Sequence, residues 1–216
     1  MVTNRDIDKT IRILRREIRR WEEPIVGHYR ADPFRTLISC LLSLRTKDAT
    51  TKGASRRLFR LARSPQRMAR LSPRRIERAI YPVGFYRTKA RTIRSVCRAL
   101  LERYGGRVPD DLDELLTIKG VGRKTANLVV TLAFRKLGIC VDTHVHRISN
   151  RWGYVRTKTP EDTEMALRAK LPRRYWQSYN DLLVTFGQNL CHPTSPWCSR
   201  CALAGMCAKV GVTHSR

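Results

Sequence analysis

Apolar residues recur at helical spacing along most of the chain and predict a succession of amphipathic helices. The first stripe runs between Arg and Lys residues and is formed by Ile7, Ile11, Leu14, Ile18 and Trp21. The run Glu22-Glu23-Pro24 is expected to end this helix. Residues 34–44 are apolar on most sides, which predicts a buried helix.

Capping residues and helix breakers divide the chain that follows. Asp48 is expected to cap a helix that ends near Arg63, and Ser72-Pro73 combines a favourable N-cap with Pro at the first helical position. Pro82 and Gly84 should break that helix, and Gly105-Gly106 should close the next. A short helix is expected to end near Leu116, and a longer one to span about 124–135. Three more are expected: one from Val141-Asp142-Thr143 to about Trp152, one that begins at Thr159-Pro160, and one over 176–190. No segment alternates as a strand does, so the predicted fold class is all-α.

Charge narrows the range of partners. Lys and Arg number 44 against 18 acidic residues, which gives a formal net charge of +26 spread over the chain. A folded domain this basic is expected to bind polyanions, and nucleic acid is the favoured partner over a membrane surface or a merely Arg-rich composition. No apolar run is long enough to span a bilayer, and residues 1–20 have no signal-peptide core. We therefore expect a cytoplasmic, nucleoid-associated protein, or a nuclear one in a eukaryote.

A helix, a tight glycine turn and a second helix are predicted around Gly120-Val121-Gly122. The two glycines should allow strained dihedral angles and a close backbone approach to another molecule. Backbone N–H groups there, with the basic Arg123 and Lys124 behind them, fit a helix-hairpin-helix that grips a DNA phosphate. A plain turn between helices is the alternative. Such backbone contacts would position DNA without reading its sequence.

Lys124 and Asp142 are candidate catalytic residues. Lys124 lies at the start of a predicted helix, where the helix dipole and partial burial would lower the pKa of an ammonium and favour a nucleophilic amine. Asp142 begins the next predicted helix, so one intervening helix could bring both groups to a shared cleft. Taken separately, Lys124 could be a phosphate contact and Asp142 a helix cap.

Four of the seven cysteines follow Leu190, with intervals of six, two and five residues. They are Cys191, Cys198, Cys201 and Cys207. Four thiolates in one short loop suit Zn²⁺ or an iron–sulfur cluster, and this chemistry alone does not choose between them. The other three cysteines lie among apolar residues and are expected to be packed thiols: Cys40, Cys97 and Cys140.

Several of these motifs together resemble the endonuclease III family of helix-hairpin-helix, Gly/Pro-Asp DNA glycosylases. The signature is Gly-Val-Gly-Arg-Lys-Thr-Ala-Asn at 120–127 followed by Val-Asp-Thr-His at 141–144. Leu41-Leu42-Ser43 with Asp48, Val83-Gly84-Phe85-Tyr86 with Lys89-Ala90, and the four cysteines match in order and spacing. The likeness covers nearly the whole chain.

The resemblance implies a bifunctional DNA glycosylase and AP lyase of base excision repair. Lys124 would form a Schiff base with the sugar, and Asp142 would be the essential carboxylate. The damaged base, an oxidised pyrimidine in this family, would be flipped out of the duplex, and β-elimination would cut the strand on the 3′ side. The DNA contacts implied are Gly120, Val121, Gly122, Arg123, Lys119, Arg45, Phe85 and His144. The four late cysteines would hold one 4Fe–4S cluster with a structural role.

Three positions depart from the family pattern. Lys119 stands where Pro usually precedes the glycine turn, which should loosen the turn and add a phosphate contact. Arg45 replaces a glutamine that fills the gap left by the flipped base, and Phe85 replaces an apolar wedge. Both could also be ordinary surface or core side chains. The loop before Cys198 lacks the usual basic residue, so Arg200 and Lys209 are expected to contact DNA instead.

The expected architecture has two helical lobes with the DNA cleft between them. A helical barrel with the hairpin spans 26–136, and the second lobe combines 1–25 with 137–216 and the cluster loop. The protein is expected to act as a monomer on double-stranded DNA that contains damaged bases or abasic sites. The alternatives are a monofunctional mismatch or adenine glycosylase, against which Lys124 argues, and a non-catalytic iron–sulfur DNA-binding protein.

Overall fold

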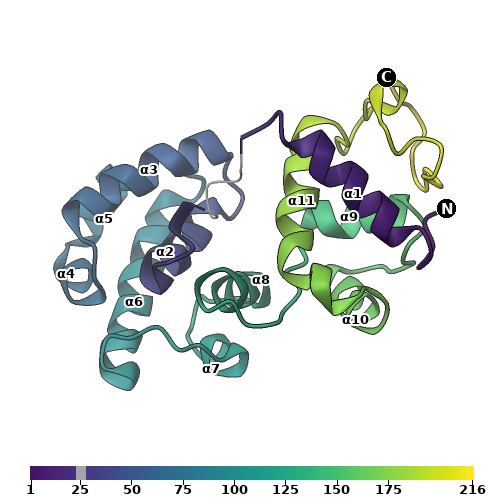
Figure 1. Ribbon diagram of the computed structural model, residues 1–216. Helices are drawn as coiled ribbons and strands as arrows, with labels where there is room; N and C mark the ends of the chain where they lie inside the picture. The colour runs from purple at the N-terminus through teal and green to yellow at the C-terminus, as the bar shows by residue number, and fades with distance from the viewer. Residues whose placement is uncertain (23–27) are drawn as a thin grey trace. The chain divides into compact units, whose positions relative to one another are not determined.

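The computed structural model describes residues 1–22 and 28–216, and every regular element in those two ranges is a helix (Figure 1). The predicted all-α fold class is therefore confirmed. Glu23 and Pro24, which were expected to end the first helix, lie outside the described residues. The first helix, α1, spans Ile7–Ile18, so Trp21 follows it instead of extending its stripe, although Trp21 still packs on the same apolar cluster.

The chain forms two compact units. Unit 2 comprises Ile25–Lys136, and unit 1 comprises Met1–Pro24 together with Leu137–Arg216. Unit 2 contains α2 (Pro33–Ser43), α3 (Asp48–Leu61), α4 (Pro65–Arg70), α5 (Pro73–Ile80), α6 (Tyr86–Tyr104), α7 (Leu112–Leu116) and α8 (Arg123–Leu128). Unit 1 contains α1, α9 (Thr143–Arg151), α10 (Pro160–Lys170) and α11 (Trp176–Asn189). None of the described helices is both long and apolar enough to cross a membrane.

The core of unit 2 is built around α2, as its apolar composition predicts. Leu37, Ile38 and Leu42 have no exposed surface, and each such side chain contributes about 1.5–3 kcal/mol through burial. Cys40 and Cys97 are buried in this unit and Cys140 in unit 1, which confirms the prediction of packed thiols.

Capping residues determine several boundaries in unit 2. Ser72 caps α5, with its hydroxyl accepting from the Arg75 amide at 3.3 Å and Pro73 in the first position. Ser64 caps the short helix α4 in the same way, which periodicity alone did not predict. Asp48 was expected to be a cap but is the first residue inside α3, where its charge still suits the helix N-terminus.

The helix after the glycine turn is shorter than expected. It was predicted over 124–135, but α8 ends at Leu128 and a π-helical segment, Val129–Ala133, continues the chain. The Thr131 hydroxyl donates to the Asn127 carbonyl at 2.7 Å, and the Lys136 amide donates to the Val130 carbonyl at 3.1 Å. Threonine bonding back to the preceding turn disturbs the regular i to i−4 pattern.

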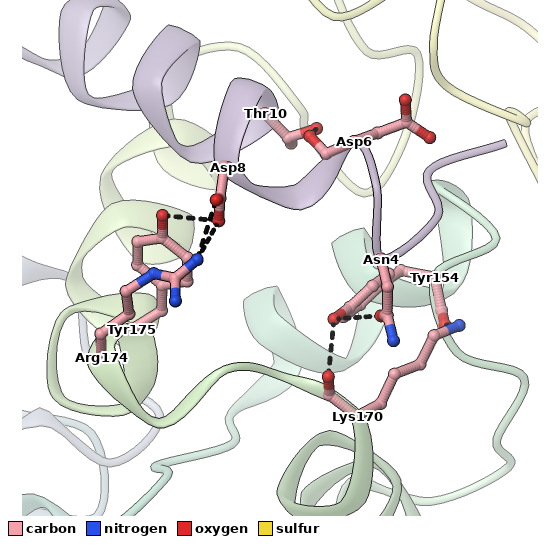
Figure 2. Close-up of polar contacts among 8 residues, drawn as sticks. All are labelled: Asn4, Asp6, Asp8, Thr10, Tyr154, Lys170, Arg174 and Tyr175. Carbon is pink, nitrogen blue, oxygen red and sulfur yellow. Dashed lines mark hydrogen bonds and ion pairs between the residues drawn. The ribbon is translucent and has the colours of Figure 1, made fainter.

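In unit 1, the N-terminal helix α1 packs against the last helix, α11 (Figure 1). Polar contacts also fix the N-terminal segment, as Figure 2 shows: Arg174 donates to both oxygens of Asp8, at 2.7 and 2.8 Å, and the Tyr175 hydroxyl donates to Oδ1 at 2.8 Å. The Tyr154 hydroxyl bonds Asn4 at 3.1 Å. The two ends of the chain thus belong to one packed unit.

Candidate functional site

The glycine turn follows α7 and leads directly into α8. Ile118 and Val121 are buried in the core of unit 2, and the Val121 amide donates to the Ile118 carbonyl at 2.9 Å. Gly120 has a φ of +97°, and a Cβ there would lie 2.5 Å from Cγ2 of Thr92 on α6. Any residue with a side chain would therefore be strained at Gly120.

Gly122 has a different environment from Gly120. Its backbone is extended, with φ −91° and ψ 169°, so the expectation of strained dihedrals at both glycines was wrong for Gly122. A Cβ at Gly122 would meet no atom within 4 Å. Packing within the chain does not require a glycine there, and the open space leaves the backbone accessible to another molecule.

Basic residues flank the glycine turn in the chain. Lys119 is exposed, whereas Arg123 and Lys124 are half-buried in the first turn of α8. Gly122 precedes them as the N-cap residue, and its carbonyl accepts from the Ala126 amide at 2.9 Å. The hairpin thus presents one lysine before the turn and two basic residues after it.

Asp142 is the N-cap of α9. Its Oδ1 accepts from the amides of His144 at 2.9 Å and Val145 at 3.0 Å, and the residue is only 7% exposed. The cap therefore holds the carboxylate in one orientation. Lys124 belongs to unit 2 and Asp142 to unit 1.

His144 lies on α9 beside the last helix of unit 1. It is half-buried, and its Nδ1 is 3.1 Å from Nη2 of Arg147. A Cβ at Gly187 on α11 would lie 2.4 Å from that Nδ1, so the glycine makes room for the imidazole. The DNA contact predicted for His144 stays a prediction.

Arg45 and Phe85, predicted at two separate loops, lie together. The Arg45 guanidinium is 4.9 Å from the centroid of the Phe85 ring, a distance suited to a cation–π contact. Phe85 is 60% exposed. Both residues have positive φ, 53° and 57°, which is uncommon for residues with a side chain. An exposed aromatic ring on strained backbone is typical of a contact surface rather than of a packed core.

Lys89 was noted as part of the family pattern in the sequence, but no role was predicted for it. Only 8% of it is exposed, and its Nζ donates to the carbonyls of Leu42 and Leu44 and to the Thr46 hydroxyl. Burial lowers the pKa of this lysine to about 8. The signal was present in the sequence, because Lys89 lies at helical spacing from Ile93 and Val96 on the buried stripe of α6.

The four late cysteines line one cavity in unit 1. Each is half-buried, and the cavity wall also includes Phe186, Leu190 and Trp197. Burial raises the pKa of the Cys201 thiol to about 11, so a positive group in the cavity would be needed to keep this thiol ionised. Within residues 1–22 and 28–216, no three His, Cys, Asp or Glu side chains are close enough together to hold a single metal ion. The four thiols instead lie around a cavity, as ligands of a group larger than one ion would.

Hydrogen bonds from Arg151 at the end of α9, and from the backbone of the loop itself, hold the cysteine loop. Arg151 donates to the Cys191 Sγ at 3.4 Å and to the carbonyls of His192 and Pro193, each at 2.6 Å. The Lys209 amide donates to the Cys207 Sγ at 3.3 Å. N–H donors of this kind surround sulfur ligands in metal centres.

Comparison with known proteins places this arrangement in a family. Residues 38–173 match the family described as "HhH-GPD superfamily base excision DNA repair protein". Endonuclease III of Thermotoga maritima is 50% identical over 181 residues, which cover 84% of this chain and 85% of that protein. This chain belongs to the endonuclease III family.

Solved structures of endonuclease III agree with this assignment. One, a trapped covalent endonuclease III–DNA intermediate in an estranged-adenine complex, has a TM-score of 0.87 at 34% identity and covers 97% of each chain. Another, a non-covalent endonuclease III–DNA complex, has a TM-score of 0.86 at 33% identity with the same coverage. The fold of the endonuclease III family therefore extends over almost the whole chain.

Proposed function

We propose that this protein is a DNA glycosylase and AP lyase of base excision repair that acts on double-stranded DNA as a monomer. The observation that carries the proposal is a half-buried lysine, Lys124, directly behind a glycine turn with open space at Gly122, in a member of the endonuclease III family. The turn would bind a backbone phosphate and bring the sugar of the damaged nucleotide to the amine.

Lys124 is the nucleophile in this proposal. Its neutral Nζ attacks the sugar C1′, the bond from C1′ to the base breaks, and the base leaves with a proton. The lysine nitrogen then forms a double bond to C1′ as the C1′–O4′ bond breaks, O4′ takes up a proton, and the sugar ring opens to an iminium. The iminium acidifies the C2′ proton; loss of that proton and rupture of the C3′–O3′ bond, with the 3′ phosphate as leaving group, cut the strand on the 3′ side. Water then hydrolyses the iminium and restores the lysine.

Asp142 assists in two ways in the proposed mechanism. Its carboxylate stabilises the positive charge that develops on the sugar, and it accepts a proton from Lys124 before the attack. The amides of His144 and Val145 hold one carboxylate oxygen, so the group needs little reorganisation during the reaction. Oxidised pyrimidines are the proposed substrates, in keeping with the family.

Cys191, Cys198, Cys201 and Cys207 are proposed to hold one 4Fe–4S cluster. The residues fit because all four line a single cavity and N–H donors lie beside two of the sulfurs. The bound cluster would supply a structural cross-link for a loop whose only regular element is the short turn Cys198–Arg200. We expect Cys198→Ser to lower the iron and sulfide content of the purified protein, and full retention of both would contradict the assignment.

The proposal is tested with two duplexes, one containing thymine glycol and one an abasic site. We expect strand cleavage and a borohydride-trapped protein–DNA adduct on both. Activity on the abasic site alone would keep the lyase and reject oxidised pyrimidine as the substrate. Base removal without an adduct would indicate a monofunctional glycosylase, and no activity on either duplex would indicate a DNA-binding protein without this chemistry.

A further inference from the structure

The loops that carry Arg45 and Phe85 meet at their backbones. The Gly84 amide donates to the Thr46 hydroxyl at 3.1 Å, and a Cβ at Gly84 would lie 2.7 Å from the Arg45 carbonyl oxygen. No side chain fits between the two loops. The position of Arg45 relative to Phe85 therefore depends on this direct contact.

Lys89 ties the same two loops together from inside the unit. It lies four residues after Phe85, and its amide donates to the Phe85 carbonyl at 2.9 Å. Its Nζ donates to the carbonyls of Leu42 at 2.7 Å and Leu44 at 2.5 Å and to the Thr46 hydroxyl at 3.1 Å. These three acceptors match the three donors of an ammonium.

The acceptors of Lys89 also explain why a charged group is suited to this place. Leu42 is in the last turn of α2 and Leu44 is its C-cap residue, where carbonyl groups lack partners within the helix. The negative end of the helix dipole favours a cation there. Burial nevertheless disfavours the charge, so Lys89 is better explained by the geometry it enforces than by a gain in stability.

That geometry is an exposed pair on strained backbone. Arg45 and Phe85 both have positive φ, and strained residues persist only where surrounding contacts fix them. A pair fixed in advance loses less conformational freedom when it binds than two mobile side chains do. A planar guanidinium beside an aromatic ring has the shape and polarity to stack on bases.

We propose that Lys89 is a positioning residue for damage recognition, holding Arg45 and Phe85 as one preformed pair that enters the base stack beside the lesion. This inference rests on the proposed function. It predicts that loss of the Lys89 ammonium weakens binding to damaged DNA far more than binding to undamaged DNA, because only the damaged duplex accepts the pair.

The first test measures affinity for two duplexes, one with a tetrahydrofuran abasic analogue and one undamaged. We expect Lys89→Met to lower the ratio of the two affinities about tenfold and Lys89→Arg to restore part of it. Lys47→Met is the matched control, because Lys47 is exposed in the same loop and its loss removes the same charge. An equal fall of both affinities in Lys89→Met would overturn the proposal.

Two further variants keep the test informative if Lys89→Met folds poorly. Thr46→Val removes the hydroxyl shared by Gly84 and Lys89 while the buried Lys89 ammonium keeps its two carbonyl acceptors, and we expect a smaller fall in the same ratio. Adding Thr46→Val to an Arg45→Ala/Phe85→Ala double variant should change the ratio no further. If Thr46→Val lowers the affinity ratio in the double variant as much as it does in the native chain, the contacts of Thr46 do not act through Arg45 and Phe85.

A measurement on the free protein separates this proposal from the proposed function. With fluorinated phenylalanine in all five Phe positions, Phe85→Ala identifies the Phe85 resonance. We expect Lys89→Met or Thr46→Val, but not Lys47→Met, to shift or broaden it. If the native chain fails to cleave abasic DNA, the proposed function is wrong. A shifted or broadened Phe85 resonance in the two variants would still show that Lys89 and Thr46 fix the position of Phe85. The opposite outcome would be cleavage by the native chain together with an unchanged Phe85 resonance and an unchanged affinity ratio in Lys89→Met and Thr46→Val. That outcome would overturn the positioning role of Lys89 and leave the proposed function intact.

Discussion

Two lysines of unit 2 lie near the N-terminal ends of their helices in contrasting surroundings. Lys89 on α6 is 8% exposed and donates to three oxygen atoms, and burial lowers its pKa to about 8. Lys124 on α8 is half-buried and follows a turn with open space beside Gly122. A search for reactive amines by pKa alone would select Lys89, although its acceptors enclose it.

The difference teaches that a lowered pKa does not by itself identify a reactive lysine. The lowered pKa of Lys89 belongs to an amine that carbonyl groups enclose. This amine can position neighbouring residues but cannot reach a sugar. A nucleophile also needs access to the substrate, and the proposed nucleophile, Lys124, is half-buried two residues after the open space at Gly122. Access and geometry therefore decide between a structural and a reactive lysine, and pKa supports the decision.

The largest expected effect separates the two lysines directly. Lys124→Ala should abolish borohydride trapping on abasic DNA and lower strand cleavage by on the order of 10³-fold or more, as expected for loss of a nucleophile. Lys89→Met should still form the adduct at saturating enzyme. The measurement is adduct yield against enzyme concentration. Trapping that survives in Lys124→Ala and disappears in Lys89→Met would reverse the assignment.

Two aspartate caps offer a second comparison between a structural and a reactive group. Asp142 and Asp111 each accept from two amides, at 2.9 and 3.0 Å in both cases. Asparagine can keep a cap but carries no charge, so Asp142→Asn should fold normally and lose roughly 10²-fold or more in cleavage rate. Asp111→Asn, the matched control, should keep the native rate. Equal rates in the two variants would leave Asp142 with a capping role only.

The two glycines of the hairpin should also respond differently. Gly120→Ala meets both a positive φ and Thr92, so we expect a loss of about 1–3 kcal/mol in the free energy of unfolding. Gly122→Ala should unfold like the native chain but bind duplex DNA more weakly, because the new methyl group projects into open space. Denaturant titration and DNA affinity measure the two effects. Unchanged DNA affinity in Gly122→Ala would argue against a backbone contact there.

The smallest effect is a pH dependence due to Lys89. Its folded pKa of about 8 lies below the ordinary 10.5, so between these values the unfolded chain holds a proton that the folded chain has released. The free energy of unfolding contributed by this group should therefore rise as pH increases from about 8 to 10.5. Comparing native protein with Lys89→Met across that range isolates the contribution, and parallel curves would contradict it.

The sequence was most informative where a local signal defines a boundary. Ser72-Pro73, Gly105 and Asp142 each mark a helix end that the structure has at the same place. The π-helical segment at Val129–Ala133 was not predicted, because apolar spacing is nearly the same in both kinds of helix. The short helix α4 was missed, since six residues are too few to establish a period.

The sequence named candidate site residues but could not give the geometry that relates them. Family resemblance pointed to Arg45 and Phe85 one at a time, whereas their stacking depends on a tertiary contact at Gly84 that no local pattern encodes. Lys89 could have been suspected, because a charged residue on a buried stripe needs partners. Its acceptors at Leu42 and Leu44 come from more than 40 positions earlier in the chain.

The pairing of α1 with α11 has a consequence for biosynthesis. Helix α1, which precedes unit 2 in the chain, buries Ile7, Ile11 and Leu14 in a cluster whose other buried members, apart from Val2, come from residues 139–203. All residues of unit 2 are synthesised before that cluster can be completed. The nascent chain must therefore carry an exposed apolar helix while unit 2 folds behind it, and the basic residues along α1 help to keep that helix from aggregating in the interval.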